Sequence, residues 1–69
     1  MRHVLIYPDP ESDWWVAEVP SLPGCVSQGK SRDEALENVR DAIEGWIDAA
    51  RARGWEVPPD RPQMQLCAV

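Results

Sequence analysis

The chain has 69 residues with a net charge of −5, and 43% of its residues are hydrophobic, so we expect one small folded domain rather than a disordered tail. Twelve acidic against seven basic side chains disfavour direct binding to nucleic acid and suit either a basic protein partner or simple solubility. The chain has no apolar run of about 18 residues and no signal peptide at its start, so we expect no membrane contact and predict a cytoplasmic location.

Three short β-strands are predicted in the first part of the chain. The first covers about residues 2–7, where β-branched, Leu and Tyr side chains favour a strand. The second covers about residues 14–19 and follows a turn so short that the two strands must be antiparallel. The third covers about residues 25–28, so the three strands form a meander.

The stretch VPSLPGCVSQG lies between the second and third strands and contains the residue types of a constrained loop. Pro20 and Pro23 fix φ and stiffen the bend, and Gly24 allows a backbone conformation that a Cβ atom would forbid. A nucleophilic cysteine needs a nearby base, and the only histidine, His3, lies on the first strand. We therefore interpret Cys25 as a small buried packing residue.

A long helix is predicted over about residues 32–53. Ser31 and Glu34 have the spacing of a capping box, and apolar residues recur on one helical face down to Ala50. Gly54 stands where a left-handed residue ends many helices, and Trp55 would then pack back on Ala50.

A Pro-rich connector follows over residues 55–62, and residues 63–68 alternate as a closing strand. A right-handed crossover through the helix would bring this strand parallel to the first one and beside it. The predicted fold class is therefore α+β: a single β-β-β-α-β domain over residues 1–69, with mixed sheet order 3-2-1-4 and the helix on one face. Cys25 and Cys67 would lie on opposite edges of the sheet, too far apart for a disulfide.

Both faces of the first two strands are apolar, although one helix can cover only one of them. Leu5 and Tyr7 alternate with Val4 and Ile6, as Trp14 and Val16 alternate with Trp15 and Ala17. The uncovered set indicates a partner or self-association surface, as in a homodimer or homotetramer, unless Trp55 and the connector fold over it. The predicted interface residues are Tyr7, Asp9, Glu11, Asp13, Trp14 and Trp15.

No catalytic, cofactor-binding or metal-binding residue is predicted. Asp9, Glu11 and Asp13 alternate as at the start of a calcium loop, but the required Gly and closing Glu are absent, so a solvated turn is expected. The chain also has no Cys-x-x-Cys pair and no phosphate-binding Gly-rich loop. We therefore do not expect an enzyme.

Two segments together resemble a known family. AEVPSLPGCVSQG at residues 17–29 and SRDEALENVRDAIEGW at residues 31–46 are similar to the HicB-like antitoxins of bacterial toxin–antitoxin pairs. The resemblance implies a truncated ribonuclease H fold. It also implies a protein-binding role, in which the antitoxin masks a small basic HicA-like toxin that cleaves messenger RNA.

This chain differs from the family pattern in two ways. Asp13, Trp14 and Trp15 stand where members usually have a Gly-rich turn and a single aromatic residue. We also expect this chain to lack the DNA-binding domain that follows in many members. Two alternatives stay open: an orphan self-assembling domain without a toxin, and a degenerate metal-dependent nuclease.

Overall fold

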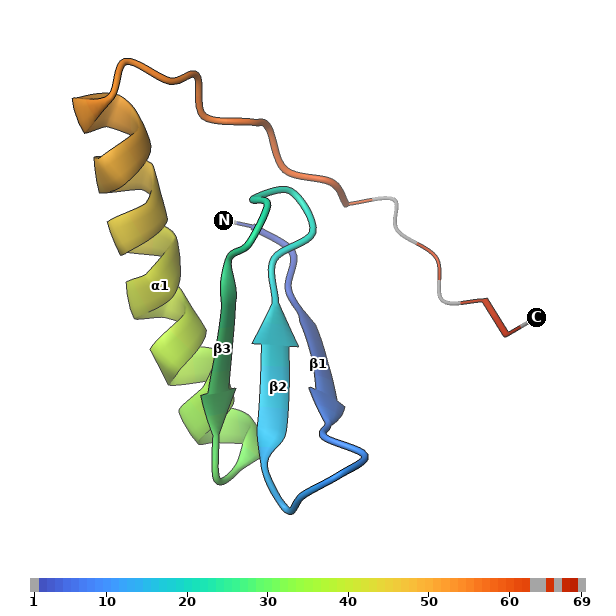
Figure 1. Ribbon diagram of the computed structural model, residues 1–69. Helices are drawn as coiled ribbons and strands as arrows, with labels where there is room; N and C mark the ends of the chain where they lie inside the picture. Colours follow the sequence, from blue (N-terminus) through green and yellow to red (C-terminus); the bar gives the residue numbers. More distant parts are fainter. Residues whose placement is uncertain (1, 63–64, 66, 69) are drawn as a thin grey trace.

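The computed structural model describes residues 2–62, 65, 67 and 68 of the chain. Three strands precede one helix: β1 (Leu5–Pro8), β2 (Trp15–Glu18), β3 (Val26–Gly29) and α1 (Arg32–Ala52). The strands form an antiparallel sheet in the order β1-β2-β3, and α1 lies along one face of it (Figure 1). The predicted α+β class, with one long helix on one face of the sheet, is confirmed.

The register of the sheet decides which side chains share a face. Leu5 pairs with Glu18, which pairs with Val26 on β3, and Tyr7 pairs with Val16. Paired residues point to the same side of a sheet, and successive residues point to opposite sides. Leu5, Tyr7, Val16 and Val26 therefore share the face that points away from the helix.

The first strand is shorter than predicted, because it begins at Leu5 and not near residue 2. The register explains the difference: the pairing of Leu5 with Glu18 would continue to His3 opposite Pro20, which has no N–H to donate to β1. The His3 N–H is bonded instead to the Asp60 carboxylate at 2.8 Å.

The predicted closing strand at residues 63–68 lies largely outside the described residues. Those of its residues that are described, Gln65, Cys67 and Ala68, belong to no strand. The fourth position in the order 3-2-1-4 stays a prediction, and β1 is an edge strand of the described sheet.

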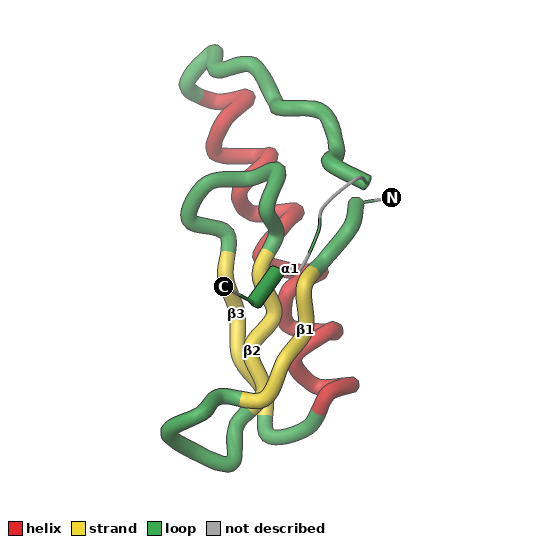
Figure 2. Tube along the Cα trace, turned by 90° about the vertical axis from the view of Figure 1, so that its right-hand side faces the viewer, coloured by secondary structure: helices red, strands yellow, loops and turns green. Residues whose placement is uncertain are grey.

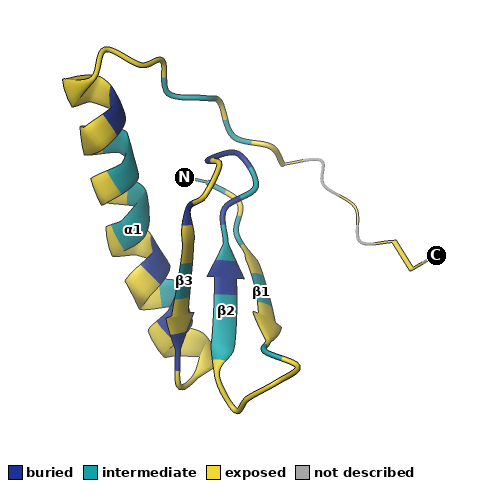
Figure 3. Ribbon diagram, viewed as in Figure 1, coloured by how far each residue is buried: buried dark blue, intermediate teal, exposed yellow. Residues whose placement is uncertain are grey.

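The core lies between the sheet and α1 (Figure 3). Leu22 from the bend and Val39 from the helix are the largest fully buried side chains. Other buried apolar members are Ala17, Val19, Cys25 and Ala35. Ala17, Cys25 and Ala35 are small, so partly buried residues complete the packing around them.

Both ends of α1 form as the sequence predicts, with one difference. The Ser31 hydroxyl accepts from the Glu34 N–H at 3.1 Å, but the Glu34 carboxylate accepts from the Lys30 N–H and not from that of Ser31. At the other end Gly54 has φ +71°, and the Trp55 N–H donates to the Ala50 carbonyl at 2.8 Å. These contacts form a Schellman motif.

The bend before β3 is tightly bonded to itself and to the helix. The Leu22 N–H donates to the Val19 carbonyl and the Cys25 N–H to the Leu22 carbonyl, each at 3.0 Å. Gly24 has φ +78°, as expected for a position where only glycine is free of strain. The Trp46 indole N–H donates to the Pro23 carbonyl at 3.0 Å and ties α1 to the bend.

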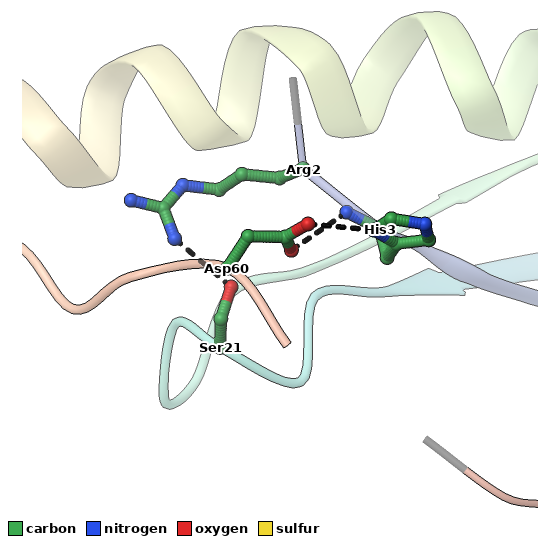
Figure 4. A network of polar contacts seen from close by, with 4 residues as sticks. All are labelled: Arg2, His3, Ser21 and Asp60. Atoms are coloured by element: carbon green, nitrogen blue, oxygen red, sulfur yellow. Dashed lines mark hydrogen bonds and ion pairs between the residues drawn. The ribbon is translucent and has the colours of Figure 1, made fainter. Parts of the chain in front are cut away.

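The connector after α1 packs Val57 against the core and then reaches the start of the sheet at Asp60. The Asp60 carboxylate accepts from the His3 backbone N–H at 2.8 Å and contacts the His3 ring nitrogen Nδ1 at 2.6 Å (Figure 4). Beside it, the Arg2 guanidinium donates to the Ser21 hydroxyl at 3.0 Å. These contacts join the N-terminal segment to the bend and to the connector.

Candidate functional site

The sheet face opposite the helix is exposed on β1 and β3 and partly buried on β2. We call it the open face, formed by Leu5, Tyr7, Val16, Glu18, Val26 and Gln28. Leu5, Tyr7 and Val26 are 36%, 37% and 49% exposed. Figure 2 shows the strands in front of α1, so the helix does not cover this face.

The described connector does not cover the open face, and the use of this face by a partner stays a prediction. Trp55 is itself 57% exposed, beyond the far end of α1. The connector contacts the start of the sheet through Asp60 and His3. The alternative in which Trp55 and the connector fold over the apolar set is therefore wrong.

Trp14 extends the open face at the start of β2. It lies two residues before Val16, so alternation places it on the same side of the sheet. Its ring is 40% exposed, and the Lys30 ammonium lies 5.9 Å from the ring centroid. A cation at this distance from an indole ring is weakly attracted to it.

The loop between β1 and β2 is an acidic turn that is folded on its own backbone. The Asp9 carboxylate accepts from the Glu11 N–H at 2.9 Å, and the Asp9 N–H donates to the Trp14 carbonyl at 2.8 Å. Glu11 and Asp13 are exposed. The turn therefore holds these acids next to Trp14, at one end of the open face.

Tyr7 lies in the middle of β1 on the open face, and its hydroxyl is electrostatically coupled to Glu18. Desolvation raises the pKa of Tyr7 above its ordinary value of 10.0, and the charge of Glu18 and a side-chain hydrogen bond to it raise it further. A neutral phenol flanked by a carboxylate presents both an apolar ring and a hydrogen-bonding group to a partner.

The six predicted interface residues separate into three groups. Tyr7 and Trp14 lie on the open face, and Asp9, Glu11 and Asp13 lie on the adjoining turn. Trp15 lies on the other side of the sheet, where it is half-buried and packs against the core. That these residues form an interface stays a prediction, with Trp15 the least accessible to a partner.

Three apolar residues of the open face are missing from the predicted set: Leu5, Val16 and Val26. The signal for the first two is the alternation within each strand, and the signal for Val26 is the register between β2 and β3. That register depends on the length of the bend, which sequence alone does not give.

The described residues offer no second type of site. They contain no group of three or more His, Cys, Asp and Glu side chains placed to hold a metal ion. Burial raises the pKa of the Cys25 thiol, which keeps it in the weakly reactive protonated form. None of the helices in this part of the chain has the length and apolarity to cross a membrane.

The chain is similar to one family of known proteins and to several individual relatives. The family described as HicB-like antitoxin of bacterial toxin–antitoxin system matches residues 3–68. A UPF0150 protein of Thermoplasma acidophilum is 35% identical over 63 residues, which cover 91% of each chain. A UPF0150 protein of Archaeoglobus fulgidus is 39% identical over 51 residues, which cover 74% of each chain. No solved structure matches the chain.

The family match includes the strands, the bonded bend and the capped helix described above. The family match therefore extends over the strands that form the open face and over the connector that follows the helix. The chain belongs to the HicB-like antitoxin family of bacterial toxin–antitoxin systems.

Proposed function

We propose that this chain neutralises a small basic, mRNA-cleaving toxin by covering the toxin surface that binds RNA. Membership of the antitoxin family supports a toxin partner. The open face is the feature that supports occlusion, because it is an apolar surface on which the described chain leaves aromatic side chains exposed. A cytoplasmic location belongs to the same proposal, since messenger RNA is the toxin's substrate.

The open face has the composition of a protein-binding surface. Tyr7 and Trp14 provide exposed aromatic rings, and aromatic side chains account for much of the binding energy at protein interfaces. Leu5, Val16 and Val26 provide apolar area around them. Burial of such side chains stabilises a complex by about 25 cal/mol for each Å² of apolar surface removed from water.

Charge around the open face favours a basic partner. Glu18 lies on the face itself, and Glu11 and Asp13 are exposed on the turn beside Trp14. The chain as a whole carries a net charge of −5. Opposite charge on a partner accelerates encounter, and the same acids would occupy the positions where a toxin holds RNA phosphates.

The mechanism is stoichiometric and involves no chemical step. One antitoxin surface covers one toxin surface, and RNA is excluded for as long as the complex persists. Residence time then depends on the buried aromatic anchors, whereas the acidic turn mainly sets the association rate.

Substitution of the two aromatic residues tests the proposal. The probe is the small basic protein encoded beside this chain, measured by calorimetry and by protection of a messenger RNA from cleavage. We expect Trp14→Ala and Tyr7→Ala each to weaken binding by about 2 kcal/mol or more, because each removes a central aromatic contact. Trp55→Ala is the matched control, since Trp55 is exposed at the far end of the helix.

Two outcomes would contradict the proposal. One is a Trp14→Ala variant that binds and protects as well as the parent while Trp55→Ala does not. The other is the lack of any complex with the neighbouring basic protein, which would favour the orphan self-assembling domain. Added magnesium or manganese should produce no RNA cleavage by this chain alone, and cleavage would favour the nuclease alternative.

A further inference from the structure

A small pocket lies at the end of the open face that adjoins the bend. Leu5, Glu18 and Val26 are paired across the three strands and form one row at this end of the sheet. Figure 1 shows the bend and the acidic turn at opposite ends of the sheet. The pocket has a volume of about 290 Å³. Six residues of the bend complete its lining: Val19, Pro20, Leu22, Pro23, Gly24 and Cys25.

The size of the pocket suits a single side chain. Pockets for small-molecule ligands usually have volumes of about 300–1,000 Å³, and this pocket lies just below that range. Leu5 and Val26 are 36% and 49% exposed, so the side chains that the strands contribute are open to an approaching protein. The pocket therefore has room for one side chain of a partner that covers the open face.

The backbone of the bend offers this pocket few hydrogen-bond donors. Pro20 and Pro23 have no N–H group. The N–H groups of Val19, Leu22 and Cys25 are bonded within the bend, each at 3.0 Å from its carbonyl acceptor. Because an anion is held by free N–H groups, this backbone disfavours a carboxylate or a phosphate in the pocket.

Glu18 gives the pocket a negative charge. Among the described residues that line the pocket, Glu18 alone carries a charged side chain. The Tyr7 hydroxyl hydrogen-bonds to its carboxylate, but a carboxylate has about four acceptor positions. The ion pairs between described residues involve other side chains. Glu18 is also partly buried, so an added cation would interact with it more strongly than with a fully exposed acid.

We propose that this pocket receives one arginine side chain of the toxin. The aliphatic part of that arginine packs against Leu5, Pro23 and Val26, and its guanidinium binds the Glu18 carboxylate. This inference rests on the proposed function, which supplies a basic partner. Arginine fits better than lysine, because the guanidinium is more weakly hydrated and can donate two parallel hydrogen bonds to one carboxylate.

The pocket and Trp14 hold the partner at two separate points of the open face. Glu18 follows Trp14 by four residues, so in an extended chain the two lie on the same side and roughly 13 Å apart. The toxin should therefore present an arginine and an apolar patch at a matching separation. Two different contacts at the two ends fix the orientation in which the toxin is covered.

Replacement of Glu18 by glutamine tests the pocket, because glutamine keeps the size of the side chain and an oxygen that can accept from Tyr7. The probe is the small basic protein encoded beside this chain, with binding followed by surface plasmon resonance. We expect Glu18→Gln to weaken binding by about 10- to 100-fold, mainly through faster dissociation, because a partly desolvated charge pair is lost. Circular dichroism checks that the variant keeps the parent fold.

Glu11→Gln is the matched control, since it makes the same charge change on the exposed acidic turn. It should weaken binding by less than about fivefold, mainly through slower association, because an exposed acid contributes to encounter more than to residence. The comparison separates the pocket from the general effect of negative charge.

A double-mutant cycle identifies the arginine. Each arginine of the basic protein is replaced by alanine and measured against the parent chain and against Glu18→Gln. We expect one of these replacements to lose most of its effect in the Glu18→Gln background, while the others keep theirs, because side chains that touch are coupled and distant ones are not. Lysine at that position should recover only part of the binding.

Two results would overturn the pocket and leave the proposed function in place. One is a Glu18→Gln variant that dissociates as slowly as the parent, although Trp14→Ala weakens the complex. The other is a cycle in which no arginine of the basic protein is coupled to Glu18. If the parent chain itself forms no complex with the basic protein, the proposed function fails, and the pocket proposal fails with it.

Discussion

Gly29 ends β3 at a point where strand and helix approach too closely for any side chain. A Cβ atom built on Gly29 would lie 2.7 Å from the Glu34 carbonyl carbon and 2.8 Å from the Ala35 Cα, and would also meet the Ala35 nitrogen. All three are backbone atoms, so the conflict cannot be relieved by a change of rotamer. The closeness of β3 to α1 thus depends on one residue.

Two glycine substitutions should therefore have opposite effects on stability. We expect Gly29→Ala to lower the free energy of unfolding by about 3 kcal/mol or more, because backbone must move to admit the methyl group. Gly45 lies inside α1, and a Cβ built there has no atom within 4 Å apart from the neighbouring backbone of the helix itself. Gly45→Ala should therefore raise the free energy of unfolding by about 0.5–1 kcal/mol. Urea denaturation of both variants checks the prediction, and an equal effect at the two positions would contradict it.

At the scale of elements, α1 is the only helix in the described chain, and its first turn is bonded through Ser31. The Ser31 hydroxyl accepts from Glu34 N–H, and Asp33 and Glu34 place negative charge at this end of the helix. Both effects satisfy or stabilise the free N–H groups of the first turn. The same turn contacts Gly29, so the start of α1 supports the edge strand β3 as well.

Removal of the cap should therefore cost stability, and a second capping residue should restore it. We expect Ser31→Ala to lower the free energy of unfolding by about 1 kcal/mol. Ser31→Asp should stay within about 0.5 kcal/mol of the parent, because its carboxylate can accept the same N–H. Chemical denaturation followed by circular dichroism measures both, and a Ser31→Asp variant as unstable as Ser31→Ala would show that the cap is not the cause.

The helix is the element that sequence predicts best, because its signals are local. Ser31 and Gly54 mark its ends within a few residues, and the apolar period marks its buried face. The strands are less well predicted, since the start of β1 depends on the register between β1 and β2, which brings His3 opposite Pro20. The His3–Asp60 contact joins residues 57 positions apart, and no short-range pattern indicates it.

The residues of the open face can be predicted from the sequence only in part. Alternation separates Trp14 from Trp15 and shows that one apolar set must remain uncovered. It does not say which set faces the helix, because both sets are apolar. The three-dimensional packing decides this by placing Trp15 and Ala17 against α1 and leaving Tyr7 and Val16 outside.

For the molecule as a whole, the connector is held by Val57, which packs against the core, and by the Asp60 carboxylate, which bonds to His3. Hydrogen bonds from the His3 side chain and backbone lower the pKa of Asp60 below its ordinary value of 3.8. A carboxyl with a lowered pKa in the folded state stabilises that state above its unfolded pKa. The contribution is lost as the pH falls through the lowered value.

We therefore expect the connector to detach in acid, from just below pH 3.8 downward. Asp60→Asn should be less stable than the parent at neutral pH, and the difference should vanish once Asp60 is protonated in the parent. Denaturation midpoints of both proteins across this range, with the Asp60 carboxyl shift followed by NMR, provide the measurement. A difference that persists unchanged in acid would mean that the carboxylate charge is not responsible.

The bonded bend at residues 19–25 separates what holds the fold from part of what a partner would meet. Its buried side chains, backbone hydrogen bonds and positive-φ glycine serve the fold. Leu5, Tyr7 and Val16 of the open face lie outside this bend, on strands that it only connects to the core. Their side chains can therefore change, and with them the surface offered to a partner, while the bend keeps its bonds.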